Sequence, residues 1–144
     1  MNPGQAAASN GEPFRWPLRV YYEDTDLGGV VYYANYLKFM ERARTEWLRA
    51  LGFEMSAMSR ELGCQFVVSR ADVAFRQPAR LDDALVATVR LVRRSPARLV
   101  LDQRVAKGDT ELVHATITLA CITTGTFRPT PIPPSLVRTL ETIA

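Results

Sequence analysis

Three carboxylates stand close together near the start of the chain, at Glu23, Asp24 and Asp26, and a glycine pair follows them at Gly28–Gly29. A run of β-branched and aromatic residues precedes them, and a helical pattern comes after. The free N–H groups at a helix start favour negative charge and can hold a developing oxyanion. A carboxylate beside such donors could attack an activated carbonyl carbon, or activate a water molecule as a general base.

The elements that must position these residues follow from the spacing of the apolar residues. Residues 14–23 are rich in β-formers and predict a first strand. Apolar residues recur at helical spacing over residues 34–51, and Gly52 stands where a left-handed C-cap belongs, which predicts one helix of about five turns. On its polar face, Arg42 and Glu46 have the i,i+4 spacing of an ion pair.

Strand patterns dominate the rest of the chain. Alternation predicts four further strands, over residues 65–76, 84–92, 98–106 and 111–123. Turns separate them, at residues 78–83, 93–96 and 107–109. A short helical turn is expected over 56–62, and a terminal helix over 135–143 with Ser135 as its N-cap. One strand, one long helix and four more strands predict an α+β fold whose antiparallel sheet curls around the helix.

The composition fits one globular domain. The chain has 144 residues, of which 47% are hydrophobic and 23% charged, enough for a substantial core. The net charge of +3 favours an anionic ligand only weakly, and the scattered basic residues exclude a nucleic-acid arm. No apolar run has the length of a membrane span. We predict a disordered tail over residues 1–13 without a signal peptide, and a single domain over 14–144.

The two cysteines, Cys64 and Cys121, lie far apart in apolar, strand-like runs. Neither belongs to a CxxC pair, which argues against zinc and thioredoxin-like sites. We expect two buried, reduced thiols in a cytoplasmic protein. His114 is the single histidine, and the sequence holds no cluster of metal ligands, so we expect neither a metal nor another cofactor.

The corner and the helix resemble a known family. The matching residues are Asp24–Asp26, the run Gly28–Tyr36, the segment Glu41–Glu46 and, in the expected place, the turn Pro78–Asp83. They are similar to those of the Tol-Pal-associated acyl-CoA thioesterases, relatives of 4-hydroxybenzoyl-CoA thioesterase. This resemblance implies the hotdog fold, a long central helix wrapped by a curved antiparallel sheet of about five strands. It also implies a homodimer or homotetramer with active sites at the dimer interface.

The resemblance implies roles for particular residues. Asp26 matches the second Asp of the family's Asp-x-Asp-x-x-Gly motif and is the predicted catalytic carboxylate, either as nucleophile or as general base. Tyr33 is predicted to offer its backbone N–H to the thioester oxygen, a main-chain role that tolerates Tyr where several relatives carry His. Gly29 would permit close approach of backbone and substrate. Arg93 and Arg94 are the predicted ligands of the CoA phosphates, and the alternative is that they form an ordinary solvated turn.

Other polar residues have simpler interpretations. Glu23 and Asp24 are expected to support the turn rather than to react. Glu41 is the second candidate carboxylate, because a helix Glu is catalytic in another branch of hotdog thioesterases, but a solvated helix residue is the favoured interpretation. The resemblance gives His114 no role, so an ordinary packing or surface position is expected.

Two classes of function follow. The leading prediction is an acyl-CoA thioesterase that hydrolyses an acyl thioester to a carboxylic acid and CoA. The alternative is a non-catalytic module that binds acyl-CoA or an acyl carrier protein within an envelope-associated complex. A hotdog dehydratase needs a histidine before the helix, and Tyr32–Tyr33 supply none. The acyl-chain specificity, and the choice between CoA and carrier-protein thioesters, stay open.

Overall fold

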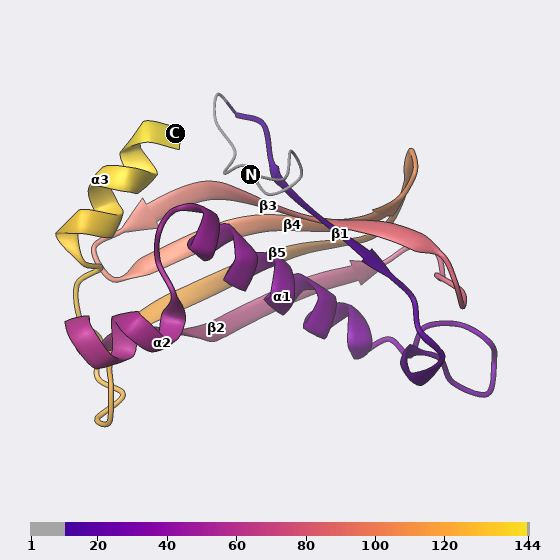
Figure 1. Cartoon of the computed structure of the whole chain (residues 1–144), viewed down its shortest axis with the longest axis horizontal. Coiled ribbons are helices and arrows are strands. Elements are labelled where there is room, and N and C mark those ends of the chain that lie inside the picture. The colour runs from indigo at the N-terminus through magenta and orange to yellow at the C-terminus, as the bar shows by residue number, and fades with distance from the viewer. Residues whose placement is uncertain (1–10, 144) are drawn as a thin grey trace.

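The computed structural model describes residues 11–143, which form a five-stranded sheet with its helices on one side (Figure 1). The strands are β1 (Phe14–Arg19), β2 (Cys64–Phe75), β3 (Ala84–Ser95), β4 (Arg98–Lys107) and β5 (Thr110–Thr123). The helices are α1 (Asn35–Ala50), α2 (Met55–Ala57) and α3 (Pro134–Ile143), with a 3₁₀ turn at Tyr22–Asp24 and a π-helical turn at Met58–Leu62. This order confirms the predicted α+β fold. Residues 1–10 of the predicted tail lie outside the described part.

All strand pairs are antiparallel, and the strand order is β1-β3-β4-β5-β2. β1 and β2 are therefore the two edge strands, although they come first in the chain. α1 lies across one face of the curved sheet and packs mainly on β3, with β1 and β4 beside it (Figure 1). This is the arrangement of helix and sheet that the hotdog fold implies.

The length of α1 follows from an apolar stripe that repeats every three or four residues. Its buried members are Tyr36, Phe39, Met40, Ala43, Trp47 and Leu48. The helix ends in a Schellman motif, in which the Gly52 N–H donates to the Arg49 carbonyl and the Phe53 N–H to the Leu48 carbonyl. Gly52 has a φ of +94°, so the predicted glycine C-cap is confirmed.

The sheet has an inner face toward α1 and an outer face that no described helix covers (Figure 1). Alternate residues of the central strands fill the inner face and are buried, including Leu85, Ala87, Val89, Leu99, Leu101, Val105, Val113, Ala115 and Ile117. The residues between them point outward and are mostly polar or charged. Gln103 is the exception, because it faces inward and is completely buried.

Two element ends differ from the prediction. β1 stops at Arg19, and the predicted continuation is a 3₁₀ turn instead, because the Asp24 carboxylate accepts a hydrogen bond from the Tyr21 N–H at 2.8 Å. α3 begins at Pro134, so Ser135 is a first-turn residue and not the N-cap. Proline suits the first helical position because its φ is already helical and its missing N–H is not needed there.

β3 is longer than predicted. It continues to Ser95, past a register irregularity between Leu91 and Arg93, so Arg93 and Arg94 belong to the strand and not to a turn. A β-bulge adds a residue to one strand and breaks the alternation. The alternation of residues that predicted this strand therefore stopped at position 92, although β3 continues to Ser95.

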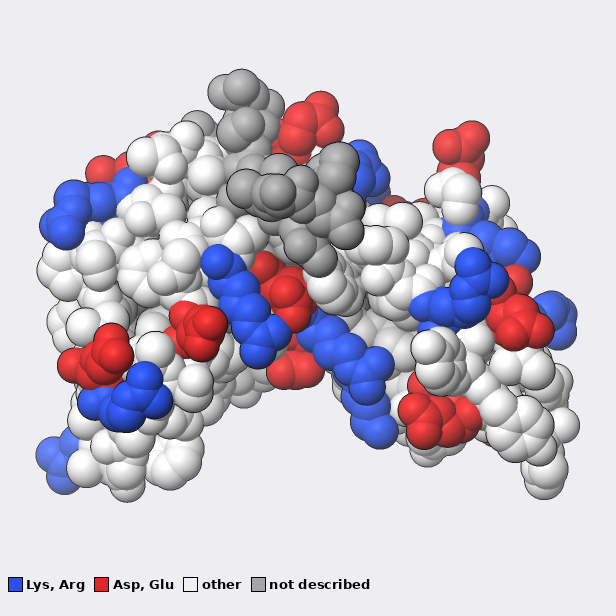
Figure 2. Space-filling model, viewed as in Figure 1, with Lys and Arg blue, Asp and Glu red and all other residues white. Residues whose placement is uncertain are grey.

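Acidic and basic side chains are interspersed on the helix-bearing side of the molecule (Figure 2). On α1, Glu46 forms its ion pair with Arg49, so the pair predicted with Arg42 is wrong. Residues three apart on a helix are neighbours just as residues four apart are. No helix within residues 11–143 is long and apolar enough to cross a membrane.

Candidate active site

The loop that carries Asp26 is closed by short hydrogen bonds. The Asp26 N–H donates to the Val30 carbonyl (3.0 Å), and the Gly29 N–H donates to the Asp26 carbonyl (3.0 Å). The Oδ1 atom of Asp26 accepts from the Gly28 N–H at 2.8 Å, which orders the turn. The side chain is exposed, and its Oδ2 atom has no hydrogen-bond partner among residues 11–143. One oxygen holds the turn, and the other is available for chemistry.

The two glycines of the loop serve different purposes. Gly29 has a φ of +77°, a backbone conformation that glycine adopts without steric cost. A Cβ atom on Gly29 would meet nothing within 4 Å, whereas one on Gly28 would lie 3.1 Å from Oδ1 of Asp26. Within one chain, a side chain at position 28 would therefore be crowded by Asp26, whereas a side chain at position 29 would be strained by the backbone conformation.

The start of α1 carries unused donors. Its N-cap position, Ala34, makes no side-chain cap. The Asn35 side chain, which could have capped the helix, donates instead to the Asp24 carbonyl at 2.9 Å. Among the described residues, the N–H groups of Tyr33 and Ala34 have no protein acceptor. These two donors lie where the helix dipole favours negative charge.

A cavity of about 250 Å³ opens between the start of α1 and the end of β2. Tyr33, Tyr36 and Phe75 line it, with the Phe75 ring 5.8 Å from that of Tyr33 and 5.9 Å from that of Tyr36. The Tyr36 hydroxyl accepts a hydrogen bond from the buried Ala79 N–H at 2.9 Å, and burial raises the pKa of Tyr36. The Ala79 carbonyl accepts from the Val31 N–H (2.9 Å), so the turn at 78–83 anchors the whole corner.

The other carboxylates near α1 have structural partners. Asp24 caps the Tyr21 N–H with its side chain and accepts from the Tyr32 N–H with its carbonyl, which confirms its supporting role. Glu41 is exposed and accepts a hydrogen bond from the Thr45 hydroxyl at 3.2 Å.

The neighbouring Tyr33, and to a smaller extent the Asp26 carboxylate, raise the pKa of the exposed Tyr32 phenol. The Asp26 carboxylate therefore has a small electrostatic effect on Tyr32.

Arg93 and Arg94 point to opposite faces of the sheet. Arg93 pairs with Val100 on the outer face and lines a cavity of about 500 Å³ there. Arg94 pairs with Leu99 on the inner face and forms an ion pair with Glu141 of α3 at 3.5 Å. The two arginines, adjacent in sequence, therefore do not converge on one ligand.

The outer-face cavity brings Arg93 together with two arginines that the sequence analysis did not single out, Arg70 of β2 and Arg98 of β4. None of the three forms an ion pair with an acidic residue in the described part of the chain. Hydroxyl groups complete the lining, from Ser69, Ser95 and Thr118. Three different strands supply this basic cluster, so no local motif could reveal it.

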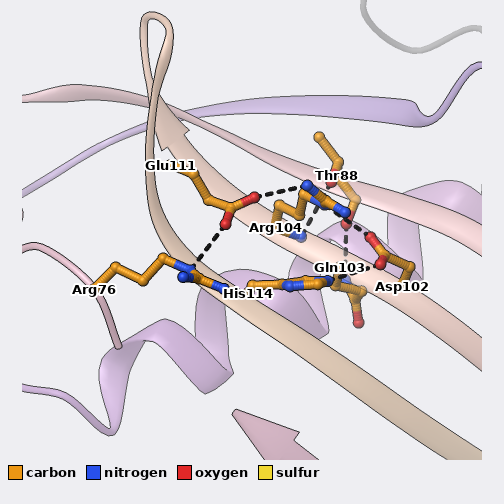
Figure 3. A network of polar contacts seen from close by, with 7 residues as sticks. All are labelled: Arg76, Thr88, Asp102, Gln103, Arg104, Glu111 and His114. Carbon is orange, nitrogen blue, oxygen red and sulfur yellow. Dashed lines mark hydrogen bonds and ion pairs between the residues drawn. The ribbon is translucent and has the colours of Figure 1, made fainter. Parts of the chain in front are cut away.

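His114 takes part in a polar network on the outer face (Figure 3). Its Nε2 atom lies 2.8 Å from the Asp102 carboxylate, which also accepts from Arg104 at 3.1 Å. Glu111 then bridges Arg104 (2.8 Å) and Arg76 (3.0 Å). Burial by itself would raise the pKa of Asp102, but the hydrogen bonds from Arg104 and His114 outweigh it and lower that pKa. His114 is therefore a half-buried side chain of the outer face, in agreement with the expected packing or surface position.

Both cysteines are free and buried, as predicted. Cys64 and Cys121 come from the neighbouring strands β2 and β5. Burial, with a smaller contribution from Cys64, raises the pKa of the Cys121 thiol to about 12. A thiol with such a pKa is not a nucleophile near neutral pH. Both cysteines are buried members of the hydrophobic core.

A curved five-stranded antiparallel sheet, a long helix across it and a carboxylate loop at the helix start define a thioesterase-type domain. The family model described as Thioesterase-like superfamily matches residues 20–140, and the chain belongs to this superfamily.

Individual relatives are similar to this chain over most of its length. The chain is 41% identical over 120 residues to the acyl-CoA thioesterase YbgC of Haemophilus influenzae, covering 83% of this chain and 88% of the relative. It is 42% identical over 125 residues to the acyl-CoA thioester hydrolase YbgC of Escherichia coli, covering 86% and 92%. A crystal structure of a probable thioesterase from Bartonella henselae superposes with a TM-score of 0.82 at 34% identity, covering 85% of this chain and all of the other.

Proposed function

We propose that this protein is an acyl-CoA thioesterase, which hydrolyses an acyl thioester to a carboxylic acid and CoA. The observation that carries the proposal is the corner: Asp26 keeps one carboxylate oxygen without a partner in the loop that leads to the helix start, where the N–H groups of Tyr33 and Ala34 have no acceptor among residues 11–143. The relatives named as acyl-CoA thioesterase and acyl-CoA thioester hydrolase support the same activity, since they match at 41% and 42% identity over most of the chain.

In the proposed reaction, the thioester carbonyl oxygen accepts a hydrogen bond from the Tyr33 N–H. The helix dipole and this donor stabilise the negative charge that builds on the oxygen as the carbonyl carbon becomes tetrahedral. Asp26 acts on the same carbon through its free oxygen, either by direct attack to give a mixed anhydride that water opens, or by taking a proton from an attacking water. In both routes the C–S bond breaks and the CoA thiolate leaves.

We place the CoA phosphates at the basic cluster of Arg70, Arg93 and Arg98, because guanidinium groups bind phosphate oxygens in pairs. This cluster is not near Asp26 of its own chain. The corner adjoins the start of β3 through the hydrogen bond from the Val20 N–H to the Asp83 carbonyl, and Arg93 lies near the other end of the strand. Nine strand residues separate these ends, a distance of about 30 Å.

We therefore propose that two chains build each site. Antiparallel pairing of the β2 edges of two copies would bring the basic end of one chain beside the corner of the other. Supporting this, Val68 and Phe75 of β2 are each 48% exposed although they are large and apolar. Large exposed apolar side chains on an unpaired edge strand favour association. We also propose a cytoplasmic location, where the Cys64 and Cys121 thiols stay reduced.

Release of CoA tests the proposal directly. The purified protein is incubated with short, long and aromatic acyl-CoAs, and the free thiol is measured with a thiol reagent. We expect saturable hydrolysis of at least one class. Absence of release above background with every acyl-CoA, from a folded protein that still binds them, would favour the non-catalytic binding module instead.

A further inference from the structure

A groove runs between α1 and β2 on the inner face. α1 packs mainly on β3, β1 and β4, and it leaves inner-face residues of β2 such as Ala71 and Phe75 exposed. The cavity beside Tyr33 lies at one end of this groove. A second cavity, of about 180 Å³, lies further along α1 and has mostly apolar walls, from Leu48, Met55, Phe66, Val68 and Leu119. The groove thus leads from the candidate active site to an apolar pocket.

Arg44 lines this apolar pocket and is only partly exposed. Burial lowers the pKa of its guanidinium, an effect that the nearby charge of Glu41 partly offsets. No acidic side chain lies within ion-pair distance of Arg44 among residues 11–143, and the one hydrogen bond of its guanidinium goes to Gln103. A partly desolvated cation without a counter-ion destabilises a fold, so its presence points to a ligand.

Gln103 holds the guanidinium in place. Its Oε1 atom accepts from Nη1 of Arg44 at 2.9 Å. Its Nε2 atom donates to the Met40 carbonyl (3.0 Å) and to the Thr88 carbonyl (3.2 Å), which fixes the orientation of the amide. Gln103 is completely buried and comes from β4. The sheet therefore positions Arg44 through a side chain that has no contact with solvent.

Glu41 and Thr45 are the other polar groups of the pocket. They lie on the solvent side, where the Thr45 hydroxyl donates to the exposed Glu41 carboxylate at 3.2 Å. The remaining guanidinium donors of Arg44 have no partner in the described chain. A ligand that matches this lining has an apolar body and oxygen acceptors at its end, and a carboxylate fits a guanidinium best because two N–H groups can bind its two oxygens.

We propose that the α1–β2 groove takes the acyl chain of the substrate and that Arg44 binds a carboxylate at the far end of that chain. The preferred substrates would then be ω-carboxyacyl thioesters, the monothioesters of dicarboxylic acids. This inference rests on the proposed function, because it sets the thioester carbonyl at the Tyr33 N–H. Arg44 follows Tyr33 by eleven residues, nearly all of them in α1, which is a distance of about 16 Å at the helical rise; helical side chains lean toward the N-terminus, so a medium-length chain is required.

Matched pairs of substrates test the proposal. The value of kcat/KM is measured for suberoyl-CoA against octanoyl-CoA, and for dodecanedioyl-CoA against lauroyl-CoA, in the wild type and in Arg44→Met, Arg44→Lys and Arg42→Met. We expect a wild-type preference for the dicarboxylic member of at least one pair. Arg44→Met lowers that preference by tenfold or more, whereas Arg44→Lys retains part of it. Arg42, an exposed arginine on the same helix, serves as the control, and its replacement leaves the preference unchanged.

Binding of the free acids separates this proposal from the proposed activity. The Kd values of dodecanedioic acid and lauric acid are measured by calorimetry for the wild type and Arg44→Met. If no thioester is hydrolysed but the diacid binds more tightly in an Arg44-dependent way, the activity is wrong and the groove assignment holds. If thioesters are hydrolysed without preference for a terminal carboxylate, or if Arg44→Met lowers both members of a pair equally, the groove assignment is wrong and the activity holds.

Discussion

At the scale of single residues, the contacts of the carboxylate oxygens separate Asp24 from Asp26. The Asp24 side chain accepts a hydrogen bond from the Tyr21 N–H, and its carbonyl accepts from the Tyr32 N–H and the Asn35 side chain. The Asp26 side chain accepts only through one oxygen, from the Gly28 N–H. Sequence alone could rank Asp26 first only by resemblance, because two aspartates spaced two apart on an extended segment look alike. The hydrogen bonds that their side chains accept distinguish Asp24 from Asp26 in the folded chain.

The left-handed backbone of Gly29 predicts a cost for any side chain there. In Gly29→Ala, we expect a loss of about 1–2 kcal/mol in the free energy of unfolding, because a non-glycine residue is strained at a φ of +77°. We also expect kcat to fall, because the strained turn carries Asp26. Urea unfolding and thioesterase assays measure the two effects.

Gly52→Ala is the matched control for that variant, because Gly52 also has a positive φ, of +94°, but lies at the far end of α1. Its stability should fall by a similar amount while kcat stays at the wild-type value. An equal loss of kcat in both variants would mean that the effect at Gly29 is general destabilisation and not a displaced Asp26.

At the scale of elements, the position of α1 depends on its contact with the turn at 78–83. The Tyr36 hydroxyl and the Ala79 N–H meet in the core, and Ala79 in turn holds Val31 just before the helix start. The turn therefore connects the helix to the carboxylate loop. Its residues were recognisable in the sequence as a turn, but their contact with α1 was not, because it joins residues 43 positions apart.

Removing the hydroxyl in Tyr36→Phe leaves the buried Ala79 N–H without an acceptor. We expect the free energy of unfolding to fall by about 1–3 kcal/mol. Because the anchor lies beside the helix start, kcat/KM should fall as well. Denaturation and steady-state kinetics test this, with Tyr22→Phe as the control on an exposed tyrosine. Wild-type stability in Tyr36→Phe would contradict the anchoring role.

The helix and most strands could be predicted because their periodicity reflects burial on one face. The six buried residues of α1 show the spacing that the sequence pattern showed, and the glycine at its C-terminal end has the expected backbone. The pattern failed at β3, where the irregularity after Leu91 turns Arg93 outward and Arg94 inward. The basic cluster and the Arg44–Gln103 contact could not be predicted from the sequence either, because the fold and not the local sequence brings their residues together.

At the scale of the whole molecule, the network of His114, Asp102, Arg104, Glu111 and Arg76 joins β4 and β5 to the end of β2 (Figure 3). The pKa of Asp102 is lower in the folded protein than its ordinary value of about 3.9. A lowered carboxyl pKa contributes stability above the unfolded value, and this contribution is lost as the pH falls through the folded value. The network should therefore stabilise the sheet at neutral pH and fail in acid.

Asp102→Asn tests this pH dependence. We expect the variant to be less stable than the wild type by about 1–2 kcal/mol at neutral pH, because charge-assisted hydrogen bonds are lost. The difference should shrink as the pH falls below about 4, where the Asp102 carboxyl of the unfolded chain takes up a proton, and it should vanish below the lower pKa of the folded protein. Unfolding at a series of pH values measures it. Asp109→Asn, at an exposed turn position, should show no such trend. A constant difference at all pH values would contradict a lowered pKa of Asp102 in the folded protein.

The proposed two-chain site predicts an oligomer. Light scattering should give a mass of at least twice the 16.1 kDa of one chain. Val68→Lys, which places a charge on the β2 edge, should shift the protein toward the single-chain mass and lower activity in parallel. Val92→Lys, on the interior strand β3 and 53% exposed, should change neither. A wild-type protein that is active at the mass of one chain would contradict the two-chain site.

The measurement that tests the central proposal most directly is kcat of Asp26→Asn with the best acyl-CoA. Asparagine keeps an oxygen for the Gly28 N–H, so the turn is retained while the charged oxygen is lost. We predict a fall in kcat of about 10²–10⁴-fold at wild-type stability, with Glu23→Gln as the control that keeps its activity. A folded Asp26→Asn variant with kcat within a few-fold of the wild type would contradict the catalytic role of Asp26.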